Sequence, residues 1–400
     1  MYAIFKSFST ELKFYLMMNT FFSFGTGLSA VFQSVFLWKL DKTYTLLAHY
    51  SLYWSITIII SFGICAWLAR KTSPMIAMRL GFGFYLITYL IMLVFHDTLS
   101  EQIVLLGAAN GMAMSLYYVG VHMAVLDLTT NDKRDQFLYI EGILLTISGI
   151  IAPLLAGIII SRFNGMTGYF IVFFLTCLFL VFAFITSLKI KGNPVTSKSY
   201  LWEVIRRPSR EWKRMYPVMF ADGIVSGAYT TFLITMMTFK VAGGEMELGI
   251  YNTAVEVVAI LAFYMLAKFS KPSYRILLFA IGSISILLSS VLLSVFPVLF
   301  SLLIFGLLSP IAMTMISTSM NAMIYSSIES DEQYKEKRLD YIIIREIPLG
   351  VGRIIGVFIF LAMQVYYDID KLLTVSFSFF PIVYVIMVPF LYSVWKTKKS

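Results

Sequence analysis

The chain has 400 residues, of which 59% are apolar and only 13% are charged, and its formal net charge is +9 at pH 7. This number of charged side chains is too small to cover the surface of a soluble globule of 400 residues. The composition therefore excludes a soluble globular protein. It predicts instead an all-α membrane protein whose solvent is mostly lipid.

Twelve apolar stretches follow one another, each near the ~20 residues that a helix needs to cross a bilayer. We predict helices because unpaired backbone groups are costly in hydrocarbon and because the period-2 alternation of barrel strands is absent. The predicted transmembrane spans are 14–38, 46–69, 76–95, 103–127, 138–161, 167–188, 215–239, 248–267, 276–295, 299–325, 341–365 and 372–395.

The first six spans are repeated by the last six. The segment LARKTSP at 68–74 is echoed by LAKFSKP at 266–272, and the segment that begins at Arg134 is echoed by the one that begins at Arg338. Internal duplication of this kind is common in secondary transporters. It predicts two pseudo-symmetric six-helix bundles, residues 1–188 and 215–400, joined by a basic linker at 189–214.

The basic residues predict the orientation, because short loops rich in Lys and Arg stay in the cytoplasm. With the N-terminus inside, the inner segments hold 23 of the 31 basic residues. The outer loops hold Lys39, Lys42, Arg162, Lys240 and Lys371, and the spans hold Arg79, Arg345 and Arg353. Both termini are therefore expected in the cytoplasm, in a multi-pass protein of a cell membrane.

The linker and the inner loops predict the partners. Trp202, Val204, Ile205 and Trp212 among basic residues fit either a short amphipathic helix on the inner leaflet or a solvated connector. The charge forms no basic stripe interleaved with aromatics, so we expect anionic lipids as its partners and not nucleic acid. The first apolar run is too long for a signal peptide, so it is expected to remain in the mature protein. The protein is expected to be a monomer.

Sequence motifs for several catalytic chemistries are missing. The chain has no G-x-x-x-x-G-K-[ST], C-x-x-C, H-E-x-x-H or G-x-S-x-G sequence. Cys65 and Cys177 lie in apolar runs and are expected to be packed thiols. We therefore expect no enzyme activity, no cofactor and no metal site.

Ionisable residues inside the spans are the first candidates for function, because a charge at mid-bilayer costs at least ~2.5 to 3.5 kcal/mol. They are His122, Glu141, Asp222, Glu256, Arg345, Glu346 and Arg353. We expect Arg353 to face the interior within reach of Glu256, Asp222 or Glu346. A carboxylate there could change protonation as a cavity opens to either side, as proton coupling requires. The alternative is a buried pair with a structural role only.

His122 and three further residues, Asn321, Gln33 and Tyr117, are weaker candidates. His122 suits a proton relay by its ordinary pKa, but it could equally be a packed side chain. Asn321 occupies the equivalent place in the second half, which indicates that both positions face the cavity. Gln33 and Tyr117 could line that cavity or serve in packing.

These features together resemble the major facilitator superfamily over essentially the whole chain. In the family's loop signature, G-x-L-A-D-R-x-G-R-K, this chain keeps Leu68 and Ala69, but Arg70 stands where the family has its Asp, and Lys268 takes that place in the second copy. The run from Gly149 through Pro153 to Gly157 is similar to the antiporter motif G-x-x-x-G-P-x-x-G, with Ala152 replacing one Gly. The resemblance implies a gating role for these residues and export in exchange for protons.

The expected function is therefore a secondary transporter that exports an amphipathic small molecule in exchange for protons, by alternating access. The alternatives left open are a nutrient symporter or facilitator of the sugar type, a lipid or glycolipid translocator, and a polytopic membrane protein without transport activity. The absence of an N-x-[ST] glycosylation acceptor agrees with a bacterial chain.

Overall fold

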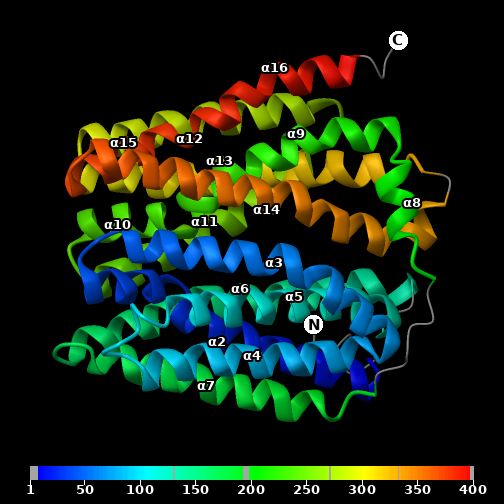
Figure 1. Ribbon diagram of the computed structural model, residues 1–400, viewed down its shortest axis with the longest axis horizontal. Helices are drawn as coiled ribbons and strands as arrows, with labels where there is room; N and C mark the ends of the chain where they lie inside the picture. The colour runs from blue at the N-terminus through cyan, green and yellow to red at the C-terminus, as the bar shows by residue number, and fades with distance from the viewer. Residues whose placement is uncertain (1–7, 129–130, 192–197, 270–271, 332, 397–400) are drawn as a thin grey trace. The chain divides into compact units, whose positions relative to one another are not determined.

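The computed structural model describes residues 8–128, 131–191, 198–269, 272–331 and 333–396. Within these residues, twelve helical spans are long and apolar enough to cross a membrane, and each of them overlaps one predicted span. The predicted all-α, twelve-span fold is therefore confirmed. Figure 1 shows the helices with their labels.

The first six spans are single helices. They are α2 (Thr10–Asp41), α3 (Thr45–Lys71), α4 (Pro74–Val94), α5 (Ile103–Leu128), α6 (Asn131–Arg162) and α7 (Thr167–Ser187). The short linker helix α8 (Leu201–Arg206) follows them.

The remaining spans are less regular. The seventh joins α9 (Arg210–Val225), the π-helix η1 (Ser226–Leu233) and α10 (Ile234–Ala242). The next four are α11 (Glu245–Phe269), α12 (Arg275–Val295) after the short 3₁₀ turn η2 (Pro272–Tyr274), α13 (Leu299–Ile328) and α14 (Tyr334–Tyr366). The twelfth joins α15 (Ile369–Phe379) and α16 (Ile382–Lys396).

The chain forms two compact units. The first is Met1–Lys42, Ile56–Ser197 and Gly244–Thr253, and the second is Thr43–Ser55, Lys198–Gly243 and Ala254–Ser400. Helices α3 and α11 therefore each begin in one unit and continue in the other. The units differ from the predicted halves in these two exchanged segments, and the linker region 189–214 divides between Ser197 and Lys198.

Local sequence explains several helix ends. The Ser9, Ser73 and Ser209 hydroxyls accept hydrogen bonds from the backbone amides of Leu12, Ile76 and Trp212 and so cap α2, α4 and α9. Gly243 has a φ of 91°, which a side chain would disfavour, and it ends α10 directly before α11 begins. Each cap satisfies backbone groups that a helix end otherwise leaves unpaired.

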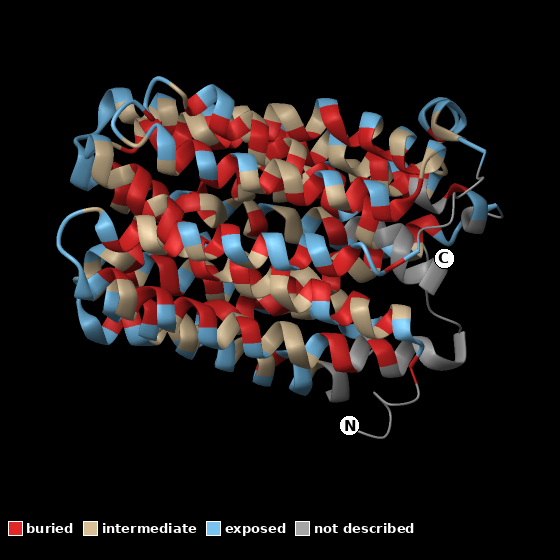
Figure 2. Ribbon diagram, turned by 90° about the horizontal axis from the view of Figure 1, so that it is seen from below, coloured by how far each residue is buried: buried red, intermediate tan, exposed pale blue. Residues whose placement is uncertain are grey.

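Apolar side chains are found both in the buried interior and on the exposed surface of each unit. Figure 2 shows buried residues running along the helices and exposed residues recurring on their outward turns. Large apolar side chains such as Ile60, Phe174 and Leu288 are exposed. In water such surfaces would favour aggregation, whereas a lipid solvent accommodates them.

Candidate transport site

The first unit contains a buried polar cluster made by three helices. Asn19 of α2 donates from Nδ2 to Oε1 of Glu141 on α6, at 2.6 Å. The Tyr117 hydroxyl of α5 donates to Oδ1 of Asn19, and the Tyr117 ring stacks on Phe22 with centroids 3.8 Å apart. All three polar residues are at most 9% exposed. Among the described residues, the hydrogen-bond donors of this cluster are neutral, the Asn19 amide and the Tyr117 hydroxyl.

Gln33 is also on α2 but does not join this cluster. It lies 14 residues beyond Asn19, which is about 21 Å along a helix. Its side chain is buried, and its Nε2 atom has no hydrogen-bond partner. A buried, unsatisfied amide is costly and therefore is a candidate for contact with a substrate.

The second unit contains a charged cluster. Arg353 Nη1 lies 3.3 Å from Glu346 Oε2 on the same helix, α14. The Arg353 guanidinium also lies over the Trp54 ring, 5.3 Å from its centroid. Arg353 is only 7% exposed, so it faces the interior as expected, and Glu346 is the candidate carboxylate that it contacts.

Asp222 of α9 is held separately. Its Oδ1 atom accepts a hydrogen bond of 2.8 Å from the Tyr384 hydroxyl of α16. Arg345 and Arg353 are also close enough to interact with it electrostatically. The second unit thus combines two acidic groups with permanent cations.

Glycines bring the backbones of α9, η1 and α14 together around Arg353. A methyl group at Gly352 would lie 2.2 Å from the Phe220 carbonyl oxygen, and one at Gly227 would lie 2.2 Å from that of Arg353. Gly223 and Gly356 are equally close to backbone atoms. Small residues permit such crossings in membranes. Gly352 and Gly356 therefore form a small-residue face on α14.

The π-helix lies at this crossing. Thr231 Oγ1 donates 2.6 Å to the carbonyl of Ser226, five residues earlier, and Ser51 Oγ donates 2.6 Å to the carbonyl of Gly227. Segments of π-helix are frequent at functional sites. The start of α3 is thus bonded to the irregular part of the seventh span.

The antiporter-like run on α6 is a second close crossing, with the start of α11. A methyl group at Gly157 would lie 2.8 Å from the Glu245 carbonyl oxygen, and one at Gly249 would lie 2.7 Å from that of Pro153. Thr253 Oγ1 donates 2.9 Å to the carbonyl of Ile150. Gly157 thus lies in a tight helix contact, while the gating role of Gly149, Pro153 and Gly157 stays a prediction.

Glu245 strengthens the attachment of α11 to the first unit. Its carboxylate forms an ion pair with Lys39 of α2 and accepts a hydrogen bond of 2.8 Å from the Tyr169 hydroxyl of α7. Glu245 lies at the end of its span, where charged residues are common, and for that reason sequence reasoning passed it over.

The other predicted site residues lie apart from these clusters. Glu256 is exposed on α11, and Asn321 is half-buried on α13. Arg70 lies at the end of α3. His122 and Lys268 lie outside the described side chains. In the part of the chain that the structure describes, no group of three or more His, Cys, Asp or Glu could hold a metal ion.

Asn19 and Tyr384 are site residues that sequence reasoning missed. Both are uncharged, so a search for intramembrane charge did not find them. The repeat offers a signal for Asn19, because it precedes Asp222 by 203 positions, between the offsets of 198 (Arg70 to Lys268) and 204 (Arg134 to Arg338). A repeat-based search would therefore have paired the first-span amide with the seventh-span acid.

An ion-pair cluster attaches the linker to the second unit outside the membrane. Lys337 Nζ lies 2.8 Å from Glu203 Oε1 of α8 and 3.4 Å from Asp331 Oδ2. The hydrogen bond to Glu203 raises the pKa of Lys337. Burial raises the pKa of Asp331, but hydrogen bonds from Tyr341 and the Gln333 amide, with Lys337, lower it overall.

The residues that suggested an amphipathic linker helix divide between two environments. Trp202 and Ile205 of α8 are exposed, while Val204 of α8 and Trp212 of α9 are buried.

Comparisons with known proteins found a matching family and relatives in Bacillus and Geobacillus. A family model described as "Major Facilitator Superfamily" matches residues 78–333. The uncharacterized protein YqgE of Bacillus subtilis (strain 168) is 29% identical over 353 residues, which cover 88% of this chain and 82% of that protein. An uncharacterized protein in the sodM 3′ region of Geobacillus stearothermophilus is 28% identical over 163 residues, or 41% and 76% of the two chains.

Solved structures show the same fold at low identity. A mutant of the nucleoside transporter NupG has a TM-score of 0.74 and 14% identity, covering 96% of this chain and 99% of that one. A structure on substrate recognition in proton dependent oligopeptide transporters has a TM-score of 0.70 and 12% identity, covering 96% and 97%. The human organic anion transporter MFSD10 has a TM-score of 0.66 and 11% identity, covering 95% and 98%.

Proposed function

The chain belongs to the major facilitator superfamily, and on that premise we propose that it exports an amphipathic small molecule in exchange for protons. The family and the fold support a secondary transporter, a multi-pass membrane protein that binds a small-molecule substrate. Proton exchange, the outward direction and a cell-membrane location with cytoplasmic termini are the parts that we add.

The setting of Glu141 is the observation that carries proton coupling. It is a buried carboxyl group inside a membrane span, and it accepts a hydrogen bond from the neutral Asn19 amide. An uncompensated charge there is costly, so protonation relieves a penalty. Among the described residues no cation forms an ion pair with Glu141, so its protonation leaves none of them without a counter-charge. Glu141 can therefore gain and lose a proton within one transport cycle.

Glu346 is the second candidate for the proton. It is the acidic partner of Arg353, and the pair is buried. Protonation of Glu346 would leave Arg353 without its counter-charge, which is costly unless Asp222 or a substrate takes its place. We therefore assign Glu141 as the proton carrier and the Arg353 pair as a charged group on the substrate pathway.

The crossing of α6 and α11 supports exchange by alternating access. Gly157 and Gly249 allow backbone contact at the run that is similar to the antiporter motif. Glycines at such a crossing let two helices separate and close again without side chains in the way. This supports exchange by alternating access, with export following from the resemblance.

The substrate class comes from this chain alone, because solved structures at 11% to 14% identity show the fold and no more. Gln33 offers a buried amide without a partner, and aromatic rings surround the Tyr117 cluster. A molecule with one hydrogen-bonding group and an apolar body fits those features.

Reconstituted liposomes with an acidic lumen and an internal pH dye test the proposal. When a substrate from a candidate panel is added outside, an antiporter carries protons out and the lumen becomes more alkaline. A symporter acidifies the lumen further, and a facilitator leaves the pH unchanged. The antiport proposal requires the first result.

Glu141→Gln tests the assignment of the proton carrier in the same liposomes. We expect it to abolish the pH response while exchange of labelled for unlabelled substrate continues. Glu101→Gln, in an exposed loop, is the matched control and should behave as the unaltered protein. A full pH response from Glu141→Gln, with loss of the response in Glu346→Gln, would move the assignment to Glu346.

A further inference from the structure

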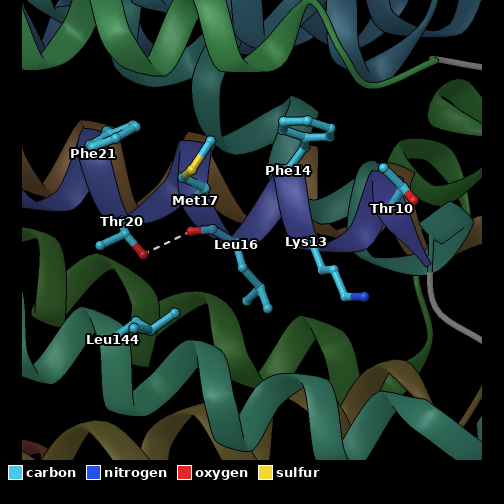
Figure 3. A pocket seen from close by; sticks show the side chains of 8 residues that line it. All are labelled: Thr10, Lys13, Phe14, Leu16, Met17, Thr20, Phe21 and Leu144. Atoms are coloured by element: carbon cyan, nitrogen blue, oxygen red, sulfur yellow. Dashed lines mark hydrogen bonds between the residues drawn. The ribbon is translucent and has the colours of Figure 1, made fainter. Parts of the chain in front are cut away.

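An apolar groove runs along the first span. It has a volume of about 420 Å³ and is lined by Thr10, Lys13, Phe14, Leu16, Met17, Thr20 and Phe21 of α2 and by Leu144 of α6. Figure 3 shows these side chains following α2, with Leu144 on the neighbouring helix. All of them belong to the first unit.

The groove has the length of one membrane leaflet. From Thr10 to Phe21 the helix advances by eleven residues, which is about 16 Å. Half of a ~30 Å hydrocarbon core is about 15 Å. Thr10 begins a 32-residue span that is longer than the hydrocarbon core, so the groove starts in the headgroup region and ends within the first leaflet, short of the midplane.

The charged group of the groove lies at one end. Thr10 and Lys13 occupy the surface end, and a long Lys side chain can place its ammonium group among lipid headgroups. Deeper, the Thr20 hydroxyl donates 2.8 Å to the carbonyl of Leu16 on its own helix and needs no other partner. The remaining lining residues are apolar, and Met17 is 42% exposed. The groove therefore fits a chain that is apolar along its length and negative at one end.

We propose that this groove binds an anionic phospholipid of the inner leaflet, with one acyl chain along α2 and its phosphate at Lys13. Charge complementarity favours an anionic headgroup, since Lys13 belongs to the segments expected on the inner side of the membrane, which hold 23 of the 31 basic residues. A compact polar substrate would leave its hydrogen-bonding groups unpaired among Phe14, Met17 and Phe21.

Native mass spectrometry of the full-length protein tests the site, with phosphatidylglycerol and phosphatidylcholine as probes. Neither a substrate nor a gradient is used, so the result is independent of the proposed transport function. We expect tighter binding of phosphatidylglycerol, and Lys13→Gln should weaken it about fivefold, the effect of one basic residue near the headgroups. Lys71→Gln, an exposed Lys at the end of α3, is the matched control and should leave that affinity unchanged.

A second variant tests the chain-binding part of the groove. Met17→Trp should fill it and reduce retention of both lipids, whereas Leu288→Trp on the exposed face of α12 should not. If Met17→Trp does not fold, Leu144→Phe replaces it. Equal binding of the two lipids, no effect of Lys13→Gln, or unchanged retention in the groove variants would overturn the proposal.

Discussion

The two units hold their intramembrane acids in different electrostatic settings. In the first, Glu141 meets the neutral Asn19 amide, which in turn accepts from Tyr117. In the second, Glu346 contacts the permanently charged Arg353. Repeated six-span halves have thus acquired one acid that can be protonated at little electrostatic cost and one that is tied to a cation. The two halves keep the same order of spans, while the side chains beside Glu141 and Glu346 differ in charge.

Two helix crossings, one in each unit, differ in how closely the helices approach. In the first unit a methyl group at Gly27 would lie 3.1 Å from the Ala152 side chain. In the second, a methyl group at Gly352 would lie 2.2 Å from a backbone oxygen. A side chain can move aside by a few tenths of an ångström, whereas two packed backbones cannot. The second unit therefore tolerates less change at its central crossing.

The largest expected effect breaks that crossing. Gly352→Ala should destabilise the protein by about 3 kcal/mol or more, because the added methyl group overlaps the backbone of α9. Gly27→Ala, the matched change in the first unit, should cost less than about 1 kcal/mol. Thermal unfolding in detergent and the yield of folded protein measure both. Equal melting temperatures for the two variants would show that the units pack alike.

The ion pair gives the next largest difference. Glu346→Gln leaves Arg353 buried without its counter-charge and should cost roughly 3 to 5 kcal/mol. Glu141→Gln keeps a group that can bond to Asn19 and should cost roughly 1 kcal/mol. Adding Arg353→Met to Glu346→Gln should recover most of the lost stability. If Glu141→Gln is the more damaging of the two single variants, the contrast between the settings is wrong.

The positions of the spans could be predicted because the length and apolarity of a span are local properties of the sequence. Gly352 and Gly356 are likewise visible in the sequence, whereas their close contact with the backbone of α9 is seen only in the structure. The π-helix at Ser226–Leu233 could not, because it arises where the seventh span meets α14 and the start of α3.

Which side chains contact one another in the site was harder to predict than which residues belong to it. Arg353 was expected to face the interior beside one of three acids, and only the structure selects Glu346. The spacing of seven residues, nearly two helical turns, could have favoured that choice, because it places both side chains on one face. Asn19 carries no charge and became visible only through its contact with Glu141.

The crossing of α6 and α11 should affect transport more than stability. Gly157→Leu would push α6 away from the Glu245 carbonyl oxygen, which is 2.8 Å from the position of a first side-chain carbon. We expect transport in liposomes to fall at least tenfold while folded protein is still obtained, since a shift of about 1 Å can cost a hundredfold in function. Gly142→Leu, on the same helix with open space around it, is the control. Normal transport by Gly157→Leu would mean that the crossing has no part in the cycle.

The contacts on either side of the linker, one set in each unit, give the smallest expected difference. They should differ in how their stability depends on pH. In the first unit, Arg79 donates to the carbonyls of Ser187 and Ile190, at 2.7 and 2.8 Å, and these acceptors do not titrate. In the second, Lys337 joins Asp331 to Glu203 of α8 through groups that do.

The direction of the pH effect follows from the two pKa shifts. The pKa of Asp331 is lowered, so its stabilising effect is present above about pH 3.9 and is lost as the pH falls through the lowered value. The pKa of Lys337 is raised, so its effect is present below about pH 10.4 and is lost as the pH rises through the raised value. The attachment of α8 should therefore be constant between about pH 4 and pH 10 and weaken outside that window.

Hydrogen exchange of the α8 amides, corrected for the intrinsic effect of pH, measures this attachment. Lys337→Met should speed exchange at Val204 and Arg207 about fivefold at pH 7, the equivalent of about 1 kcal/mol for a partly exposed ion pair. Exchange around Ser187 and Ile190 should stay unchanged, as it should everywhere in the control Lys213→Met. Acidification below the lowered pKa of Asp331 should also speed exchange at α8, because it neutralises Asp331 and spares the carbonyl acceptors of Arg79. Equal acceleration at both inner ends would show that the two attachments do not differ in kind.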